Sequence, residues 1–240
     1  MKAKPGKSAL ASLHIPAQVE MLGQFHPARA EIEDFIHQVF YQHYQADIHH
    51  YMPELLALRN DNGQLTAALG IRPALENRLF LENYLEQPVE QCMAQVMPMF
   101  EGEIRRDQVI EVGNLAASSA GGSRWLIIAL TAYLQGAGYD WVTFTALPSL
   151  RNAFKKMGLK VIALGEASKS DLDAHEQSLW GNYYDDNPQV VTVSVHHAYG
   201  VLEKQLRFEH ALHILQRLWQ QAYQIGVAQQ ALLASSPVGI

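Results

Sequence analysis

The segment RWLIIALTAYLQ (124–135) constrains the fold more than any other stretch, because it is apolar on nearly every side. A helix of that kind has no face for solvent and must be buried between other elements. Gly136 and Gly138 predict where it ends. The β-branched and aromatic runs VIEVGNLA (109–116) and WVTFTAL (141–147) predict strands before and after it. Strands that alternate with helices favour an α/β fold, in which helices flank a mixed sheet.

The rest of the chain continues this alternation. Apolar residues at helical spacing predict a helix that begins near Pro27. The Asp-Asn-Gly turn between residues 55–60 and 64–72 predicts a hairpin of two strands. Beyond these we expect a strand at 78–82, a helix at 88–100, a short helix at 148–158, strands at 159–165 and 189–195, and a polar loop at 166–188.

The pattern divides the chain into three parts. Residues 1–25 carry few element signals and are expected to form a tail, and residues 26–195 are expected to form the α/β domain. Residues 196–240 look helical again, and we expect them to be a C-terminal helical extension that packs on the domain or forms a homodimer. The apolar stripe that suggests this consists of Ala211, Ile214, Leu215, Leu218 and Ala222.

Charge and composition argue against several classes of partner. The net charge is −6 and no long run of like charge occurs, so a nucleic-acid surface is not expected. The single cysteine, Cys92, cannot form an internal disulfide. The basic start at residues 1–18 lacks the continuous apolar core of a secretory signal, and no stretch reaches the roughly 18 apolar residues of a spanning helix. The sequence therefore predicts a cytoplasmic protein without a membrane span.

The turn SSAGGSR (118–124) joins the strand at 109–116 to the apolar helix. A helix N-terminus leaves N–H groups unpaired and carries a partial positive charge, and small residues let an anion approach the backbone. Gly121 and Gly122 would give that access, and Arg124 would add a cation. The lysine of a P-loop and the pattern G-x-G-x-x-G are both absent, so nucleoside triphosphates and dinucleotides are not expected. The turn predicts either a pyrophosphate cradle or an ordinary capped turn.

The order strand, glycine-containing turn, apolar helix, strand and short helix resembles one half of the GNAT superfamily of acyltransferases. Their turn pattern, Gln/Arg-x-x-Gly-x-Gly/Ala, becomes Ser118-x-x-Gly121-x-Ser123 here, with the central glycine kept and both ends changed. The short helix ends in KMGL (156–159), which is similar to the Lys-x-Gly-Phe/Leu ending of that family. The resemblance covers roughly residues 27–195 and implies a GNAT-like fold.

A longer stretch, residues 43–90 together with 109–116, resembles the thermostable haemolysin family, which is itself GNAT-like in outline. The pieces that carry this similarity are Tyr44-x-Ala46-Asp47, Pro53-x-Leu55-Leu56, Ala68-x-Gly70-x-Arg72, Leu79-Phe80-Leu81-Glu82-x-Tyr84-Leu85 and Glu111-Val112-Gly113-Asn114-Leu115-Ala116. The strand at 109–116 is also similar to that of acyl-homoserine-lactone synthases. Gly113-Asn114 replaces their Ser/Thr-Arg pair, so lactone formation is not implied.

The resemblance implies an acyltransferase that moves an acyl group to an amine acceptor. The implied donor is acyl-CoA (coenzyme A) or the phosphopantetheine of an acyl-carrier protein, and the strand before the turn is implied to lie beside the pantetheine arm, splayed from its neighbour. Glu111 and Asn114 are the candidate catalytic residues on that strand. The candidate donor-binding residues are Leu115, Ala116, Ala120, Gly121, Gly122, Ser123, Arg124 and Thr145.

Each catalytic candidate has a structural alternative. Glu111 is a carboxylate within an apolar strand, where burial would raise its pKa and suit a general base, or where backbone and arginine donors would simply satisfy it. Asn114 either orients the thioester carbonyl or a water, or pins the end of the strand. The two residues lie three apart, on opposite faces of a regular strand, unless a bulge at Gly113 intervenes.

The general acid is missing from its usual position. Many GNAT enzymes carry a tyrosine four residues before the closing glycine of the short helix, and Phe154 stands there in this chain. Tyr183 and Tyr184 are the alternatives for protonating the leaving thiolate, or they are rim aromatics. A membrane-active cytolysin, which the family's name suggests, is a second possible function. A donor-binding module without turnover, which Phe154 suggests, is a third.

No metal site is expected from the sequence. The histidines at 43, 49, 50, 196 and 197 lack zinc-ligand spacing with cysteine, and H-E-x-x-H is absent. We expect them to be surface or loop histidines. Cys92 lies among apolar helical residues and is expected to be inert.

Overall fold

The computed structural model of the protein describes residues 16–75, 78–119, 121–208 and 213–235. Within these ranges, one seven-stranded sheet has the order β1-β2-β3-β4-β5-β7-β6, and all neighbours are antiparallel except the parallel pair β4 and β5. The strands are β1 (Gln18–Leu22), β2 (Glu54–Arg59), β3 (Leu65–Pro73), β4 (Val109–Ala117), β5 (Trp141–Ala146), β6 (Ile162–Glu166) and β7 (Gln189–Ser194). The predicted mixed α/β sheet is confirmed.

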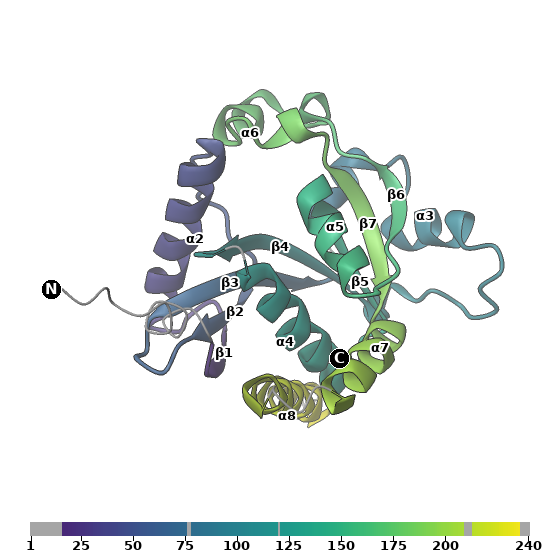
Figure 1. Ribbon diagram of the computed structural model, residues 1–240. Coiled ribbons are helices and arrows are strands. Elements are labelled where there is room, and N and C mark those ends of the chain that lie inside the picture. The colour runs from purple at the N-terminus through teal and green to yellow at the C-terminus, as the bar shows by residue number, and fades with distance from the viewer. Residues whose placement is uncertain (1–15, 76–77, 120, 209–212, 236–240) are drawn as a thin grey trace, which may run out of the picture.

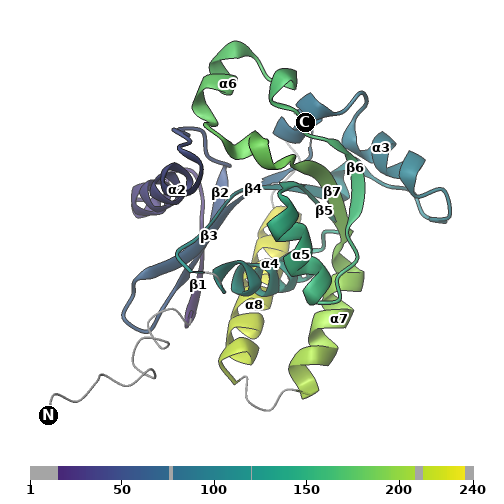
Figure 2. The same cartoon turned by 45° about the horizontal axis from the view of Figure 1, so that its top comes forward.

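Helices cover both faces of the sheet (Figure 1 and Figure 2). They are α2 (Arg29–Tyr44), α3 (Val89–Val96), α4 (Gly122–Ala137), α5 (Pro148–Lys156), α6 (Ala174–Leu179), α7 (Val195–Phe208) and α8 (His213–Ser235). Side-chain alternation along β2 separates the two faces. Leu55 and Ala57 pack with α2, whereas Leu56 and Leu58 belong to the core that contains α4, α7 and α8. None of the helices in the described ranges is long and apolar enough to span a membrane.

Helix α4 is the buried helix expected at 124–135. It packs against β3 and β4 on one side and against α8 on the other. Two glycines allow this close contact between helices. A Cβ on Gly136 would lie 2.3 Å from the Tyr223 carbonyl oxygen, and a Cβ on Gly226 would lie 2.1 Å from that of Tyr133. The C-terminal helices therefore pack on their own chain, as an extension of the domain.

Residues 1–25 are not simply the tail that the sequence suggested. Gln18–Leu22 form β1, which pairs with β2 over its whole length. A strand of five residues at the edge of a sheet shows too little alternation to be recognised from its sequence. Residues 1–15 lie outside the described part of the chain.

The strand expected at 78–82 is wrong. Phe80–Tyr84 form a 3-10 helix, because buried carboxylates take the N–H groups that a neighbouring strand would otherwise bind. Glu111 accepts from Phe80 and Leu81, and Glu82 accepts from Leu79. Other expectations differ in detail. The helix expected at 88–100 ends at Val96, and the strand expected at 159–165 begins at Ile162. The loop expected at 166–188 contains α6, whose N-cap is Asp173.

Candidate functional site

The two parallel strands at the centre of the sheet separate toward their C-terminal ends. Val109–Val112 pair with Trp141–Phe144, and the pairing between β4 and β5 ends there. Beyond that point β4 pairs with β3, and Thr145 pairs with Val190 of β7. The sheet therefore opens in its middle, beside the turn that leads into α4.

A bulge in β4 lies at this opening. Gly70 faces Gly113 and Ala68 faces Ala116, so β4 has one residue more than β3 between these pairs. Asn114 has a left-handed backbone, with φ 52°. The bulge thus lies just beyond Gly113, where it was expected. Glu111 and Asn114 both border the same cavity as a result.

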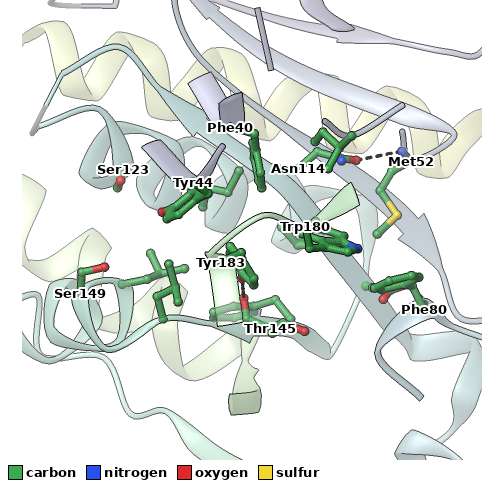
Figure 3. A pocket seen from close by; sticks show the side chains of 18 of the residues that line it. Phe40, Tyr44, Met52, Phe80, Asn114, Ser123, Thr145, Ser149, Trp180 and Tyr183 are labelled. Atoms are coloured by element: carbon green, nitrogen blue, oxygen red, sulfur yellow. Dashed lines mark hydrogen bonds between the residues drawn. The ribbon is translucent and has the colours of Figure 1, made fainter. Parts of the chain in front are cut away.

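A cavity of about 910 Å³ lies in the opening, within the usual range for sites that bind small molecules (Figure 3). It extends from the N-terminal ends of α4 and α5 to the segment around Phe80 and Tyr84. The residues that form its walls include Phe40 and Tyr44 of α2, the segment 48–52, Glu111–Leu115, Phe144 and Thr145, Gly121, Ser123, Arg124, Lys156, Trp180 and Tyr183.

One end of this cavity is positively charged. No side chain caps α4 at its N-terminus, where Gly121, Ser123 and Arg124 border the cavity. Arg124, in the first turn of α4, and Lys156, the last residue of α5, are exposed and border the cavity, and neither forms an ion pair with another described residue. The dipole of α4 and these two cations favour an anionic ligand.

The two glycines of the turn are not equivalent, contrary to expectation. A Cβ on Gly122 would lie 2.6 Å from the Cβ of Ala117, so Gly122 is packed against the end of β4 and does not face the cavity. Gly121 is exposed, and a Cβ there would meet only the indole nitrogen of Trp125, at 3.8 Å. Gly121 is therefore the residue whose small size leaves the helix N-terminus open.

The other donor-binding candidates also differ in whether they border the cavity. Leu115, Ser123, Arg124 and Thr145 border the cavity together with Gly121. Ala116 is buried in the core beneath α2 and is not part of the wall. Ala120 lies outside the described residues.

The Glu111 carboxylate is buried and fully engaged with its surroundings. Its Oε1 accepts from the N–H of Leu81 at 2.8 Å, and its Oε2 accepts from the N–H of Phe80 at 3.1 Å. Arg72, which faces it across β3 and β4, places Nε 3.6 Å from Oε2. Burial raises the pKa of Glu111, against the lowering effect of Arg72 and the two backbone donors. Glu111 thus anchors the 3-10 helix and also offers a carboxylate to the cavity.

The Asn114 side chain is bound at both ends by the segment 48–52. Its Oδ1 accepts from the N–H of Met52 at 3.0 Å (Figure 3). Its Nδ2 donates to the His50 carbonyl oxygen at 3.2 Å. These two bonds pin the strand to the cavity wall. The second N–H of Nδ2 and the second lone pair of Oδ1 are not used by them, so the role of orienting a thioester carbonyl or a water stays open as well.

Tyrosine side chains lie close to the opening, but none lies at the position of Phe154. Phe154 is buried and stacks on Phe144, with ring centroids 5.2 Å apart. Tyr183 lines the cavity, and its hydroxyl lies 3.5 Å from the Thr145 carbonyl oxygen, on the strand that turns away from β4 (Figure 3). Burial raises the pKa of Tyr183, so its hydroxyl stays protonated. The hydroxyl of Tyr184 is hydrogen-bonded to that of Tyr84.

Much of the cavity wall could not be predicted from the sequence. Arg72 is one such residue, although it stands opposite Glu111 in the sheet register. Phe40, Tyr44 and Trp180 form an aromatic wall with Tyr183; the rings of Trp180 and Tyr183 lie 5.2 Å apart. The helical spacing of the apolar residues on α2 predicts that they belong to the core. Their position beside the cavity depends on how the helix packs in the folded protein.

The family model for thermostable hemolysin matches residues 22–199. No curated protein matches the chain significantly. Among solved structures, TofI in an apo form is similar with a TM-score of 0.54 and 16% identity, covering 78% of this chain and 96% of TofI. BjaI, a CoA-dependent acyl-homoserine lactone synthase solved with MTA, has a TM-score of 0.53 and 13% identity, covering 83% of this chain and 97% of BjaI. FeeM, an N-acyl amino acid synthase from uncultured soil microbes, has a TM-score of 0.50 and 11% identity, covering 79% of this chain and 98% of FeeM. At these identities the likeness shows a shared fold, and the GNAT-like fold is confirmed.

Proposed function

The chain belongs to the thermostable hemolysin family, and on that premise we propose that it transfers an acyl group from a thioester to an amine. The proposed donor is acyl-CoA or an acyl-carrier protein, both of which carry phosphate on a pantetheine arm. The neighbours BjaI and FeeM are described as a CoA-dependent lactone synthase and an N-acyl amino acid synthase, and they share the fold. The acceptor is proposed only as a class, a small amine.

One observation carries this proposal. The gap between β4 and β5 leads from the uncapped N-terminus of α4 to the buried Glu111 carboxylate, within a single cavity. The order of these surroundings along the cavity matches a donor that has an anionic end, a long narrow arm and an apolar acyl group. In this arrangement Gly121, Arg124 and Lys156 hold phosphate, and the aromatic wall holds the acyl group.

The chemistry assigns a separate task to each of three side chains in the cavity. The amine nitrogen bonds to the thioester carbonyl carbon, the carbon–sulfur bond breaks, and the amine loses one proton. We assign the acceptance of that proton to Glu111, whose raised pKa suits a base. We assign the donation of a proton to the leaving thiolate to Tyr183, which replaces the tyrosine missing at Phe154. Arg72, beside Glu111, faces the acceptor.

Binding and turnover are tested together on the full chain. Coenzyme A and acyl-CoAs of increasing chain length are titrated by calorimetry, and thiol release is followed with a panel of amines; an acylated carrier protein is assayed in parallel. We expect saturable binding and amine-dependent thiol release. Absence of binding to every donor would overturn the proposal. Binding without thiol release would favour a module without turnover, and leakage of pure liposomes by the protein alone would favour a cytolysin.

Glu111→Gln is expected to reduce both stability and turnover. The amide offers one acceptor where Phe80 and Leu81 require two, so the free energy of unfolding falls by about 1–3 kcal/mol. Loss of the base lowers the rate of thiol release by about 10²-fold or more. In the wild type this rate rises with pH through the raised pKa of Glu111, and in the variant that rise disappears.

Glu82→Gln is the matched control for this substitution. Glu82 is also a buried carboxylate that accepts backbone hydrogen bonds, from Leu79 and Val89, but it does not border the cavity. The Glu82→Gln variant should be less stable than the wild type, as measured by urea denaturation. Its rate of thiol release should be unchanged at a temperature well below its Tm. Equal losses of turnover in the two variants would show that Glu111 acts only through structure.

A further inference from the structure

Three metal-ligating side chains meet where α2 passes the loop that follows it. The Oδ1 of Asp47 lies 3.6 Å from the Nε2 of His37 and 3.2 Å from the Nε2 of His49. All three ligand atoms lie within 4.8 Å of one another. We propose that His37, Asp47 and His49 form a binding site for a divalent transition-metal ion of the Zn²⁺ type.

The spacing of the ligand atoms fits this class of ion. Zinc binds imidazole nitrogen and carboxylate oxygen at about 2.0–2.1 Å in a tetrahedron, so neighbouring ligand atoms lie about 3.3 Å apart. The two distances to Asp47 Oδ1, 3.2 and 3.6 Å, are close to that edge length. Two imidazoles and one carboxylate select transition metals over Mg²⁺ and Ca²⁺, which prefer oxygen ligands.

The orientation of His37 is a separate observation. Its Nδ1 lies 3.0 Å from the carbonyl oxygen of Ile48. Because a carbonyl oxygen can only accept, Nδ1 carries the proton, and in the neutral ring the lone pair of Nε2 points toward Asp47. Metal-binding histidines are commonly held in this way, with the second ring nitrogen donating to a backbone carbonyl. A lone pair that faces a carboxylate at this distance favours a cation between the two.

The loop that carries two of the ligands is held in place by other contacts. The N–H of Asp47 donates to the Leu179 carbonyl oxygen at 2.7 Å, and the Tyr51 hydroxyl donates to that of Ile48 at 3.2 Å. An ion therefore meets a preformed site.

The site is continuous with the cavity wall. His49 borders the cavity, as do Ile48 and Met52, and Asn114 holds the same segment from the other side. A bound ion would tie this wall to α2 through His37. Three protein ligands leave a fourth position for water on a tetrahedral ion. The role inferred is to fix the wall, and it holds whether or not the proposed acyl transfer is correct.

Metal binding is tested on tag-free, chelator-treated full-length protein. We expect one equivalent of Zn²⁺ to bind by calorimetry, Tm to rise by several degrees with excess Zn²⁺, and Co²⁺ to give the strong visible absorption of a tetrahedral site. Asp47→Asn and His49→Ala change exposed side chains and should each weaken Zn²⁺ affinity at least tenfold, as should His37→Ala. A hundredfold excess of Mg²⁺ should not displace the ion.

His43→Ala is the control variant. His43 is exposed on the same helix, where its ring contacts Tyr44, and it lies outside the cluster. This variant should bind Zn²⁺ as the wild type does. The alternative, a plain ion pair between protonated His37 and Asp47, predicts no stoichiometric uptake. Absence of saturable binding, or equal affinity in the cluster variants and in His43→Ala, would overturn the proposal.

Discussion

Gly121→Asp is expected to bind coenzyme A at least a hundredfold more weakly than the wild type, with no loss of thermal stability. The residue precedes α4 with its Cβ position free, so aspartate fits and can cap the open N–H groups. The same carboxylate then occupies the place of a phosphate and repels the phosphate by its charge. A hundredfold loss corresponds to about 2.7 kcal/mol, a reasonable magnitude for replacing attraction by like-charge repulsion near a protein surface. Calorimetry with coenzyme A and a thermal melt measure the two effects.

Gly121→Asn separates charge from shape. Asparagine has nearly the same size and is an equally good cap, but it is neutral. We expect its affinity for coenzyme A to stay within a few-fold of the wild type. If Gly121→Asp binds as well as Gly121→Asn, the N-terminus of α4 is not the phosphate site. Gly122→Asp is a poor substitute, because its side chain would collide with Ala117 and disturb the fold.

Gly226→Ala should reduce the free energy of unfolding by about 3 kcal/mol or more. The new methyl group would lie 2.1 Å from the Tyr133 carbonyl oxygen and 2.8 Å from the Ala137 nitrogen, so α8 must move away from α4. Rigid backbone on both sides leaves no flexible side chain to yield, and overpacking of this kind is among the costly substitutions. Urea denaturation measures the change.

Gly200→Ala is the matched control. Gly200 lies inside α7, and a Cβ there meets no atom within 4 Å. Alanine is the better helix former by about 0.5–1 kcal/mol, so this variant should be slightly more stable than the wild type. A Gly226→Ala protein that loses less than about 1 kcal/mol would show that α4 and α8 can separate without cost.

The sheet and its main helices could be predicted because their sequence patterns are local. The apolar segment at 124–135 and the β-branched runs around it specify α4, β4 and β5. The 3-10 helix at Phe80–Tyr84 could not be found in this way. Its form depends on the carboxylate of Glu111, which is about thirty positions away in the sequence and reaches it only in the folded state.

The candidate site shows the same limit. The sequence indicated that small residues open the turn before α4, but Gly121 and Gly122 differ only in what lies beside them. For Asn114 two roles were left open, since its partners belong to the segment 48–52, whose position no local pattern reveals. The catalytic and donor-binding assignments therefore remain predictions, which the substitutions described for Glu111 and Gly121 address.

The early end of pairing between β4 and β5 gives this sheet an edge in its interior. Edge strands are usually at the margin of a sheet, where a second chain can add to them. Here the edge of β4 beyond Val112 faces the cavity. A linear molecule with its own amide groups could add to this edge as a short extra strand, through main-chain hydrogen bonds that require no particular side chain. Recognition of that kind depends little on sequence, so distant relatives could keep it while few residues remain in common.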